Sequence, residues 1–304
     1  RLVLVNGHGG NELKPLTRQV LTYPAEGDRP ARRVLMEVNA DGFRGRRLAA
    51  ADAADSLRIF CVGDSHTFGF GVDEEETWPE RLRQGLAGRT STIEVLNAGI
   101  LDYNSTEEAH LLEHRLLALA PDIVLWQYFV NDTNLAGERR QNQDLEDPLL
   151  DWTRPEGKGW IQAARAHSRL LHVCLDGIFR ARLAALLSAS EWSRRDDEDP
   201  GWRDVRAGLT RARDLCAERG ARFAVLLFPL MVRQGEGFAS HAALEQVGAF
   251  CGASGIPCFD AEPALLAADP EHLTVSAFDL HASAESYAAF AAAVLAWLDR
   301  MGWL

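Results

Sequence analysis

A serine that could act as a nucleophile is residue 65, within the segment GDSHTFG at residues 63–69. The segment directly follows the apolar run 57–62, which predicts a buried strand. Such a strand fixes the backbone of the serine, and the turn after it exposes the hydroxyl. If a helix follows, its first N–H groups have no partner within the helix and stand ready for a developing oxyanion. Together these features predict a nucleophilic Ser65.

A serine nucleophile needs a base, because its own pKa lies far above neutral pH. His281 is the best candidate among the nine histidines, since it lies in the segment FDLHAS at residues 278–283, just before the predicted last helix. Asp279, two residues earlier, can accept the other ring N–H and hold the tautomer. His272 is the second choice. His66 is adjacent to the serine and poorly placed to reach back to it.

The elements that must position these groups are five apolar runs that predict buried strands. These runs are 57–62, 93–97, 123–128, 222–228 and the weaker 256–260. Their nearly continuous apolar character is typical of a parallel sheet covered on both faces. Helical patterns alternate with them, which predicts a doubly wound α/β fold with right-handed crossovers. In such sheets the active site lies at the carboxyl ends of the strands, where Gly63, Gly99 and Asn131 fall.

The predicted helices occupy residues 105–119, 207–219 and 283–298. The first opens with Ser105-x-x-Glu108, a capping box, and should stop before Pro121. The last has an apolar stripe and closes the chain.

Two regions fall outside the alternation of strands and helices. We expect residues 1–55 to form an N-terminal extension packed on a catalytic domain at 56–304. Residues 133–205 are long and highly charged, which predicts a helical insertion that either covers the substrate site or decorates the periphery. Its tryptophans are Trp152, Trp160, Trp192 and Trp202.

The polar residues at the strand ends also follow the order of a known family. The segment at 63–69 resembles the first block of the SGNH/GDSL hydrolase superfamily. Later blocks of that family resemble the segments NAG at 97–99, ND at 131–132 and DLH at 279–281. The resemblance therefore covers most of the chain, and four blocks in order are far more specific than one GDS triplet.

The resemblance implies a role for each matching residue. Ser65 would be the nucleophile, His281 the general base and later the general acid, and Asp279 the residue that orients the imidazole. The backbone N–H groups of Ser65 and Gly99, with the side-chain amide of Asn131, would form the oxyanion hole. The implied fold is a three-layer α/β/α sandwich with a flavodoxin-like, mainly parallel sheet. Neither a metal nor an organic cofactor is implied.

Two positions depart from the family pattern. Family members often place the aspartate three residues before the histidine, whereas Asp279 is two residues before His281. Phe129 stands two residues before Asn131, where the family often has glycine. The first departure bears on the orienting acid, and the second on the width of the site.

The resemblance favours a serine esterase that hydrolyses an acyl ester, with acetyl esters among the candidates. An O-acyltransferase with a sugar or small-molecule alcohol as acceptor would use the same residues. A third alternative is a non-catalytic binding module, against which the presence of Ser65, His281 and Asn131 argues. The substrate would be a small-molecule, carbohydrate or lipid acyl ester, and the sequence does not select among them.

The composition of the chain limits its possible binding partners and bears on its cellular compartment. The net charge of −12, from 32 basic and 44 acidic residues, argues against a nucleic-acid partner. No apolar segment approaches the roughly 20 residues of a membrane span. The five cysteines lack metal-ligand spacing and are expected as free, buried thiols. Free thiols and the lack of a visible signal peptide slightly favour the cytoplasm, but the chain begins at Arg1, so the localisation stays open.

Overall fold

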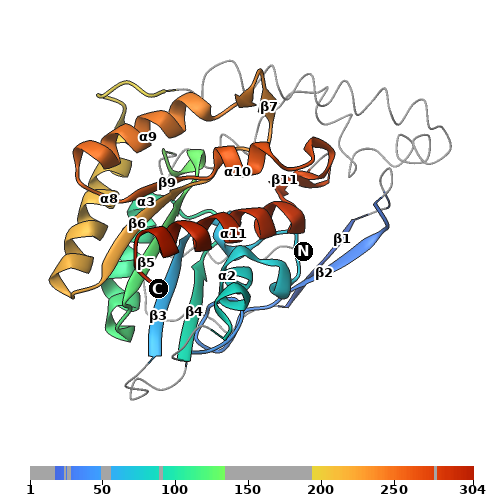
Figure 1. Ribbon diagram of the computed structural model, residues 1–304, viewed down its shortest axis with the longest axis horizontal. Helices are drawn as coiled ribbons and strands as arrows, with labels where there is room; N and C mark the ends of the chain where they lie inside the picture. Colours follow the sequence, from blue (N-terminus) through green and yellow to red (C-terminus); the bar gives the residue numbers. More distant parts are fainter. Residues whose placement is uncertain are drawn as a thin grey trace.

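A five-stranded parallel sheet lies at the centre of the protein (Figure 1). The computed structural model describes residues 18–23, 25, 29–48, 56–88, 92–133, 194–276 and 279–304. The sheet consists of β3 (Ser56–Gly63), β4 (Thr92–Gly99), β5 (Ile123–Tyr128), β6 (Arg222–Leu227) and β9 (Cys258–Asp260). Their order across the sheet is β4-β3-β5-β6-β9, and every pairing is parallel. This is the flavodoxin-like order, as predicted.

Helices cover both faces of the sheet (Figure 1). On one face α2 (Trp78–Leu86) packs against α11 (Ala284–Arg300), and the rings of Trp78 and Phe290 meet at 5.2 Å between centroids. On the other face lie α3 (Ser105–Leu111), α8 (Pro200–Glu218) and α9 (His241–Ala253). Trp202 of α8 contacts Phe250 of α9 edge to face at 5.8 Å. The fold is therefore a three-layer α/β/α sandwich.

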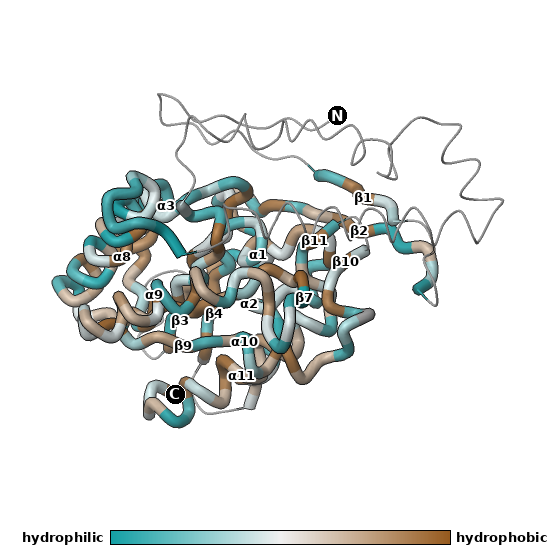
Figure 2. The backbone as a smooth tube through the Cα atoms, turned by 90° about the horizontal axis from the view of Figure 1, so that it is seen from above, coloured by the Kyte–Doolittle hydropathy of each residue, from teal (hydrophilic) through white to brown (hydrophobic). Residues whose placement is uncertain are grey.

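The central strands form because their side chains are apolar on both sides. Every residue of β5 is buried, and β3 is buried from Arg58 to its end. Gln127 is the polar exception within β5, and its Oε1 accepts a hydrogen bond from the Thr67 hydroxyl at 2.8 Å. By contrast, α8 alternates between hydrophilic and hydrophobic segments, as expected for a helix with one buried face (Figure 2).

Shorter elements complete the described part of the chain. The remaining strands are β1 (Gln19–Tyr23), β2 (Arg32–Met36), β7 (Arg233–Gln234), β8 (Gly237–Phe238), β10 (Thr274–Ser276) and β11 (Asp279–Ala282). The remaining helical segments are α1 (Ser65–Phe68), η1 (Glu74–Glu76), η2 (Leu112–Leu116), η3 (Leu117–Leu119), η4 (Val130–Thr133), α10 (Glu262–Leu266) and η5 (Pro270–His272). The pairs β1–β2, β7–β8 and β10–β11 are antiparallel hairpins.

Two helix starts differ from the sequence prediction. The capping box of α3 is formed by Asn104 and Glu107, one residue earlier than expected. The helix continues as η2 and η3 to Leu119. The predicted helix at 207–219 begins earlier, at Pro200, because Asp199 accepts the Trp202 backbone N–H and caps it.

The helical insertion predicted at 133–205 lies mostly outside the described residues. Its C-terminal end, from Pro200, belongs to α8, where Trp202 is buried in the core rather than in a cover over the site. Trp152, Trp160 and Trp192 are outside the described residues.

The described residues of the segment predicted as an N-terminal extension contact the α/β sandwich. Arg44 forms an isolated antiparallel bridge with Asn97 of β4. The β1–β2 hairpin lies beside the β10–β11 hairpin at one end of the sheet (Figures 1 and 2). The extension thus reaches the end of the molecule at which the family resemblance puts the site.

Two further sequence predictions concern thiols and membranes. Cys61, Cys216 and Cys251 are free and buried, whereas Cys258 is free and half-buried; Cys174 lies outside the described residues. Within the described ranges, no helix has both the length and the apolar character needed to cross a bilayer.

Candidate active site

Ser65 is the first residue of α1, directly after the carboxyl end of β3. Asp64 caps this short helix by accepting the His66 backbone N–H at 2.9 Å. Gly69 ends the helix in the left-handed conformation at φ 80°, which glycine adopts without steric cost. The strand, the cap and the glycine fix the backbone on both sides of the serine.

Ser65 Oγ lies 2.9 Å from Nε2 of His281, and Nδ1 of the same ring lies 2.6 Å from Oδ1 of Asp279. His281 and Asp279 both belong to β11, which precedes α11. Residues two apart on a strand project to the same side. The two-residue spacing that departs from the family pattern is therefore compatible with an aspartate that bonds the imidazole.

The histidine and the aspartate shift each other's pKa. Burial disfavours the imidazolium, but the hydrogen bond and the charge of Asp279 outweigh burial, so the pKa of His281 is raised. Burial also raises the pKa of Asp279, but the hydrogen bond and charge of His281 lower it more, with a net decrease. The pair is thus an ionised carboxylate beside an imidazole of increased basicity.

Asn131 lies in η4, just past the carboxyl end of β5. Its Nδ2 donates a hydrogen bond to Oδ2 of Asp64 at 3.0 Å. Burial raises the pKa of Asp64, against the hydrogen bonds from His66 and Asn131 that favour its carboxylate. The structure therefore brings the asparagine of the third block beside the residue that precedes the nucleophile.

Gly99 lies at the end of β4, but its N–H is engaged. That N–H donates to Oδ1 of Asn97 at 3.1 Å, and its role in the oxyanion hole stays a prediction. A Cβ at position 99 would lie 2.1 Å from the backbone nitrogen of Phe68. Glycine at this position lets the backbone of α1 approach β4 closely, which explains its presence in the motif.

A family model describes the same stretch of chain. The GDSL-like lipase/acylhydrolase family model matches residues 61–289. The chain belongs to this family. As a GDSL-type hydrolase, it is an enzyme that acts on ester bonds.

Solved structures similar to this GDSL-type hydrolase include three bacterial proteins. A member of the lipolytic protein G-D-S-L family from Veillonella parvula is 15% identical, with 80% of this chain and 99% of that chain covered and a TM-score of 0.49. The lipase/acylhydrolase from Enterococcus faecalis is 14% identical, with 81% and 96% covered and a TM-score of 0.48. A putative lipolytic protein of the G-D-S-L family from Desulfitobacterium hafniense is 15% identical, with 79% and 98% covered and a TM-score of 0.48. A search of curated proteins returns no match.

His66 is a part of the GDSL site that the sequence analysis undervalued. Its ring is buried, and its centroid lies 5.1 Å from that of His281. On its other sides it contacts Phe129 at 4.2 Å and Phe228 at 4.9 Å. Burial, and then the charge of His281, hold the pKa of His66 well below its ordinary value. A neutral His66 therefore packs beside the His281 ring, and Phe129, which stands where the family often has glycine, packs against His66.

Tyr23 is a residue beside Asp279 that sequence reasoning missed altogether. Its hydroxyl donates to Oδ2 of Asp279 at 2.8 Å, across 256 positions in the chain. A tyrosine in a short alternating strand carries no local signal for such a contact.

The remaining sequence predictions concern a substitute base and metal binding. Nδ1 of His272 lies 3.6 Å from Asp269, whereas His281 is the histidine that bonds Ser65. No cluster of three or more histidine, cysteine, aspartate or glutamate side chains suited to a metal ion occurs among the residues described.

Proposed function

We propose that the protein is a serine esterase in which Ser65 forms an acyl-enzyme. The observation that carries the proposal is the continuous hydrogen-bonded chain from Ser65 Oγ through His281 to Asp279, at 2.9 Å and 2.6 Å. These distances support the proposal, because a serine nucleophile needs a base within hydrogen-bond reach and that base needs an acid to orient it.

In acylation, His281 Nε2 takes the hydroxyl proton as Ser65 Oγ attacks the ester carbonyl carbon. The new C–O bond converts the carbonyl oxygen into an oxyanion. When the tetrahedral intermediate collapses, the bond to the alcohol oxygen breaks, and the imidazolium returns the proton to the departing alcohol. Asp279 stabilises the imidazolium and holds Nδ1–H throughout, without itself taking a proton.

The oxyanion is stabilised by two donors in this proposal. The Ser65 N–H belongs to the first turn of α1, where backbone N–H groups have no partner within the helix. Nδ2 of Asn131 uses one hydrogen for Asp64 and has a second to donate. An amide does not titrate, so this donor works at any pH at which the enzyme is folded.

In deacylation, water attacks the ester bond of the acylated Ser65. His281 takes a proton from the water and then gives it to Ser65 Oγ as the tetrahedral intermediate collapses. The products are a carboxylic acid and the free serine. An alcohol acceptor that attacks in place of water would instead make the protein an O-acyltransferase, so the fate of the acyl group is part of the test.

The test is covalent labelling by a fluorophosphonate, together with hydrolysis of p-nitrophenyl acetate. Wild-type protein should be labelled at Ser65 and should release p-nitrophenol over many turnovers, and Ser65→Ala should do neither. Unlabelled wild-type protein, or equal labelling of Ser65→Ala, would refute the proposal. Added glycerol or glucose separates the two fates of the acyl group. If the main product is the acetylated alcohol, the protein is an O-acyltransferase rather than a hydrolase.

A further inference from the structure

The β1–β2 hairpin places one tyrosine against the catalytic domain. Along β1 the side chains alternate, so that Leu21 and Tyr23 are half-buried while Val20 and Thr22 are exposed. Leu21 and Tyr23 pack on a small cluster of buried side chains that includes Phe68 of α1. The half-buried face of the β1–β2 hairpin therefore packs against the end of α1, the helix that begins with Ser65.

One set of hydrogen bonds ties the β1–β2 hairpin to the β10–β11 hairpin, which contains His281. Arg29 Nη1 donates to the carbonyl oxygens of Thr274 at 2.6 Å and Val275 at 3.2 Å, both in β10. β10 pairs with β11, which contains Asp279 and His281. The arginine thereby ties the hairpin to the element whose position matters for the triad.

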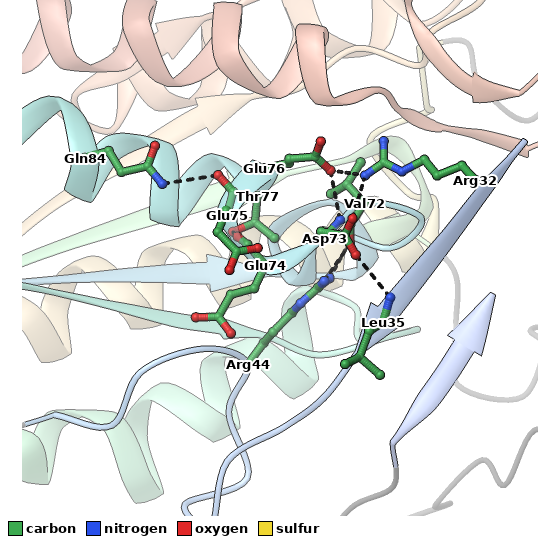
Figure 3. Close-up of polar contacts among 11 residues, drawn as sticks. Arg32, Leu35, Arg44, Val72, Asp73, Glu74, Glu75, Glu76, Thr77 and Gln84 are labelled. Carbon is green, nitrogen blue, oxygen red and sulfur yellow. Dashed lines mark hydrogen bonds and ion pairs between the residues drawn. The ribbon is translucent and has the colours of Figure 1, made fainter. Parts of the chain in front are cut away.

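A second connection reaches the segment after α1 (Figure 3). Arg32 pairs with Glu76 and lies 3.3 Å from Asp73, and the Leu35 backbone N–H donates to Asp73 Oδ1 at 3.1 Å. These contacts anchor β2. The hairpin is therefore held both by β10 and by the segment after α1, and Tyr23 is the direct partner of Arg32 across the hairpin.

The hydroxyl of Tyr23 fills the remaining side of the Asp279 carboxylate. Oδ1 of that carboxylate accepts both the backbone N–H of His281 at 3.1 Å and its ring Nδ1 at 2.6 Å. Oδ2 accepts the Tyr23 hydroxyl at 2.8 Å. With a donor on each oxygen, the carboxylate cannot rotate without breaking a hydrogen bond to a charged group.

We propose that Tyr23 is a positioning residue for the triad, because it holds the Asp279 carboxylate in the orientation that bonds His281. This inference rests on the proposed function. It gives the N-terminal extension, which precedes the family-matched residues 61–289, a part in catalysis. Tyr23 does not touch the reacting atoms, so it acts through Asp279 alone.

The experiment compares Tyr23→Phe with Thr22→Val in hydrolysis of p-nitrophenyl acetate. Both changes delete a hydroxyl from β1, but Thr22 faces solvent on the opposite side of the strand. Tyr23→Phe should lower kcat about tenfold and leave KM unchanged, the effect expected when one hydrogen bond to a charged group is lost. Thr22→Val should match the wild type. Because Tyr23→Phe also removes a hydrogen bond to a buried carboxylate, its melting temperature should fall slightly, so kcat is compared at a temperature at which both variants are fully folded.

The pH profile and a double-mutant cycle separate positioning from general weakening. Without the hydroxyl dipole, the negative charge on Asp279 is less offset and favours the imidazolium more, so the acid limb of kcat/KM should move to higher pH. In an Asp279→Asn background, Tyr23→Phe should cause no further loss, because the carboxylate it orients is gone. The inference is wrong if Tyr23→Phe changes neither kcat nor the pH of the acid limb. It is also wrong if Tyr23→Phe lowers kcat equally in the wild-type and Asp279→Asn backgrounds.

The same data distinguish this failure from failure of the proposed function. If the wild type does not hydrolyse the ester or Ser65→Ala retains activity, the esterase proposal fails. If the wild type is active through Ser65 and Tyr23→Phe behaves like Thr22→Val, only the role of Tyr23 is refuted.

Discussion

Asp64 and Asn131 lie 67 positions apart in the chain, yet Nδ2 of the asparagine donates to Oδ2 of the aspartate at 3.0 Å. Oδ1 of Asp64 accepts the His66 backbone N–H at 2.9 Å. One buried carboxylate therefore joins the start of α1 to the end of β5. A carboxylate only accepts hydrogen bonds, so the NH2 group of Asn131, and not its carbonyl oxygen, faces Asp64. Asp64 therefore sets the orientation of the Asn131 amide.

The first prediction is that Asp64→Asn lowers kcat about a hundredfold, as removal of one oxyanion donor does. The new amide can still cap α1 through its oxygen, but its nitrogen would face Nδ2 of Asn131, and that amide must turn over or withdraw. Ester hydrolysis measures kcat, and thermal melting checks that the fold survives.

Asp122→Asn is the matched control for this prediction. Asp122 precedes β5 at the opposite end of the sheet, where its carboxylate accepts the Arg58 backbone N–H at 2.7 Å. That variant should keep wild-type kcat. Equal activity of Asp64→Asn and wild type would show that Asn131 does not depend on Asp64.

The second prediction concerns the pH dependence of hydrolysis. His281 must be neutral to accept a proton, and Asp279 raises its pKa in the folded protein. The acid limb of kcat/KM should therefore lie above the ordinary histidine value of about 6.5, with activity lost as pH falls through it. Asp279→Asn should move that limb to lower pH and reduce kcat by roughly 10³- to 10⁴-fold. An acid limb at the same pH in both proteins would mean that Asp279 does not act on His281.

Much of the sheet and of the candidate site could be predicted because the signals are local. The strand at 123–128 is apolar apart from Gln127 and is found with its predicted bounds. Ser65 and His281 each lie in a recognisable segment, and the structure brings them within 2.9 Å. The contacts of Tyr23 and His66 depend instead on which distant residues the fold brings beside them, and no nearby pattern encodes that.

Errors at helix ends have a simple physical origin. Asn104-x-x-Glu107 and Ser105-x-x-Glu108 both have the form of a capping box, and the chain uses the first. The role of Gly99 in the oxyanion hole, expected from its place in the motif, stays a prediction. The hydrogen bond from its N–H to Asn97 depends on a side-chain rotamer that the sequence does not specify.

The third prediction concerns stability in acid. His66 is buried with a pKa well below its ordinary value, so the unfolded chain takes up a proton near pH 6.5 that the folded protein does not. The unfolding free energy should therefore fall as pH decreases below about 6.5, by up to about 1.4 kcal/mol per pH unit from this group. His66→Phe, which preserves the backbone N–H to Asp64 and the ring contacts, should remove this part of the decrease.

Urea unfolding at pH 7, 6 and 5 measures the slope for wild type and His66→Phe. The pKa of His281 is raised in the folded protein, so this residue stabilises the fold at pH values below the pKa of the unfolded state. That stability is lost as the pH rises through the folded-state pKa, so its effect on the slope is opposite to that of His66. It is present in both proteins, so the difference in slope reports His66. Parallel slopes for wild type and His66→Phe would refute the prediction.

The last prediction concerns Arg44, whose guanidinium reaches the carbonyl oxygen of Val72 in the segment after α1 (Figure 3). Its buried guanidinium donates to three carbonyl oxygens: Phe68 at 2.9 Å, Gly69 at 2.5 Å and Val72 at 2.6 Å. Burial lowers its pKa to about 10, so it stays charged at neutral pH. Arg44→Met would remove a charged donor from all three carbonyls. Phe68 O and Gly69 O would keep only long hydrogen bonds of 3.4 Å, from Asn97 Nδ2 and the Val72 N–H, and we expect the unfolding free energy to drop by about 3 kcal/mol.

Arg44→Met should also reduce kcat, because the three carbonyls close the turn that positions Ser65, and it should do so even at temperatures where the variant is fully folded. Arg47→Met is the control: its guanidinium pairs with Asp41 in solvent, so both stability and kcat should stay near wild type. Chemical denaturation and ester hydrolysis test the two effects separately. If Arg44→Met is destabilised but keeps wild-type kcat when folded, the extension stabilises α1 without positioning the nucleophile.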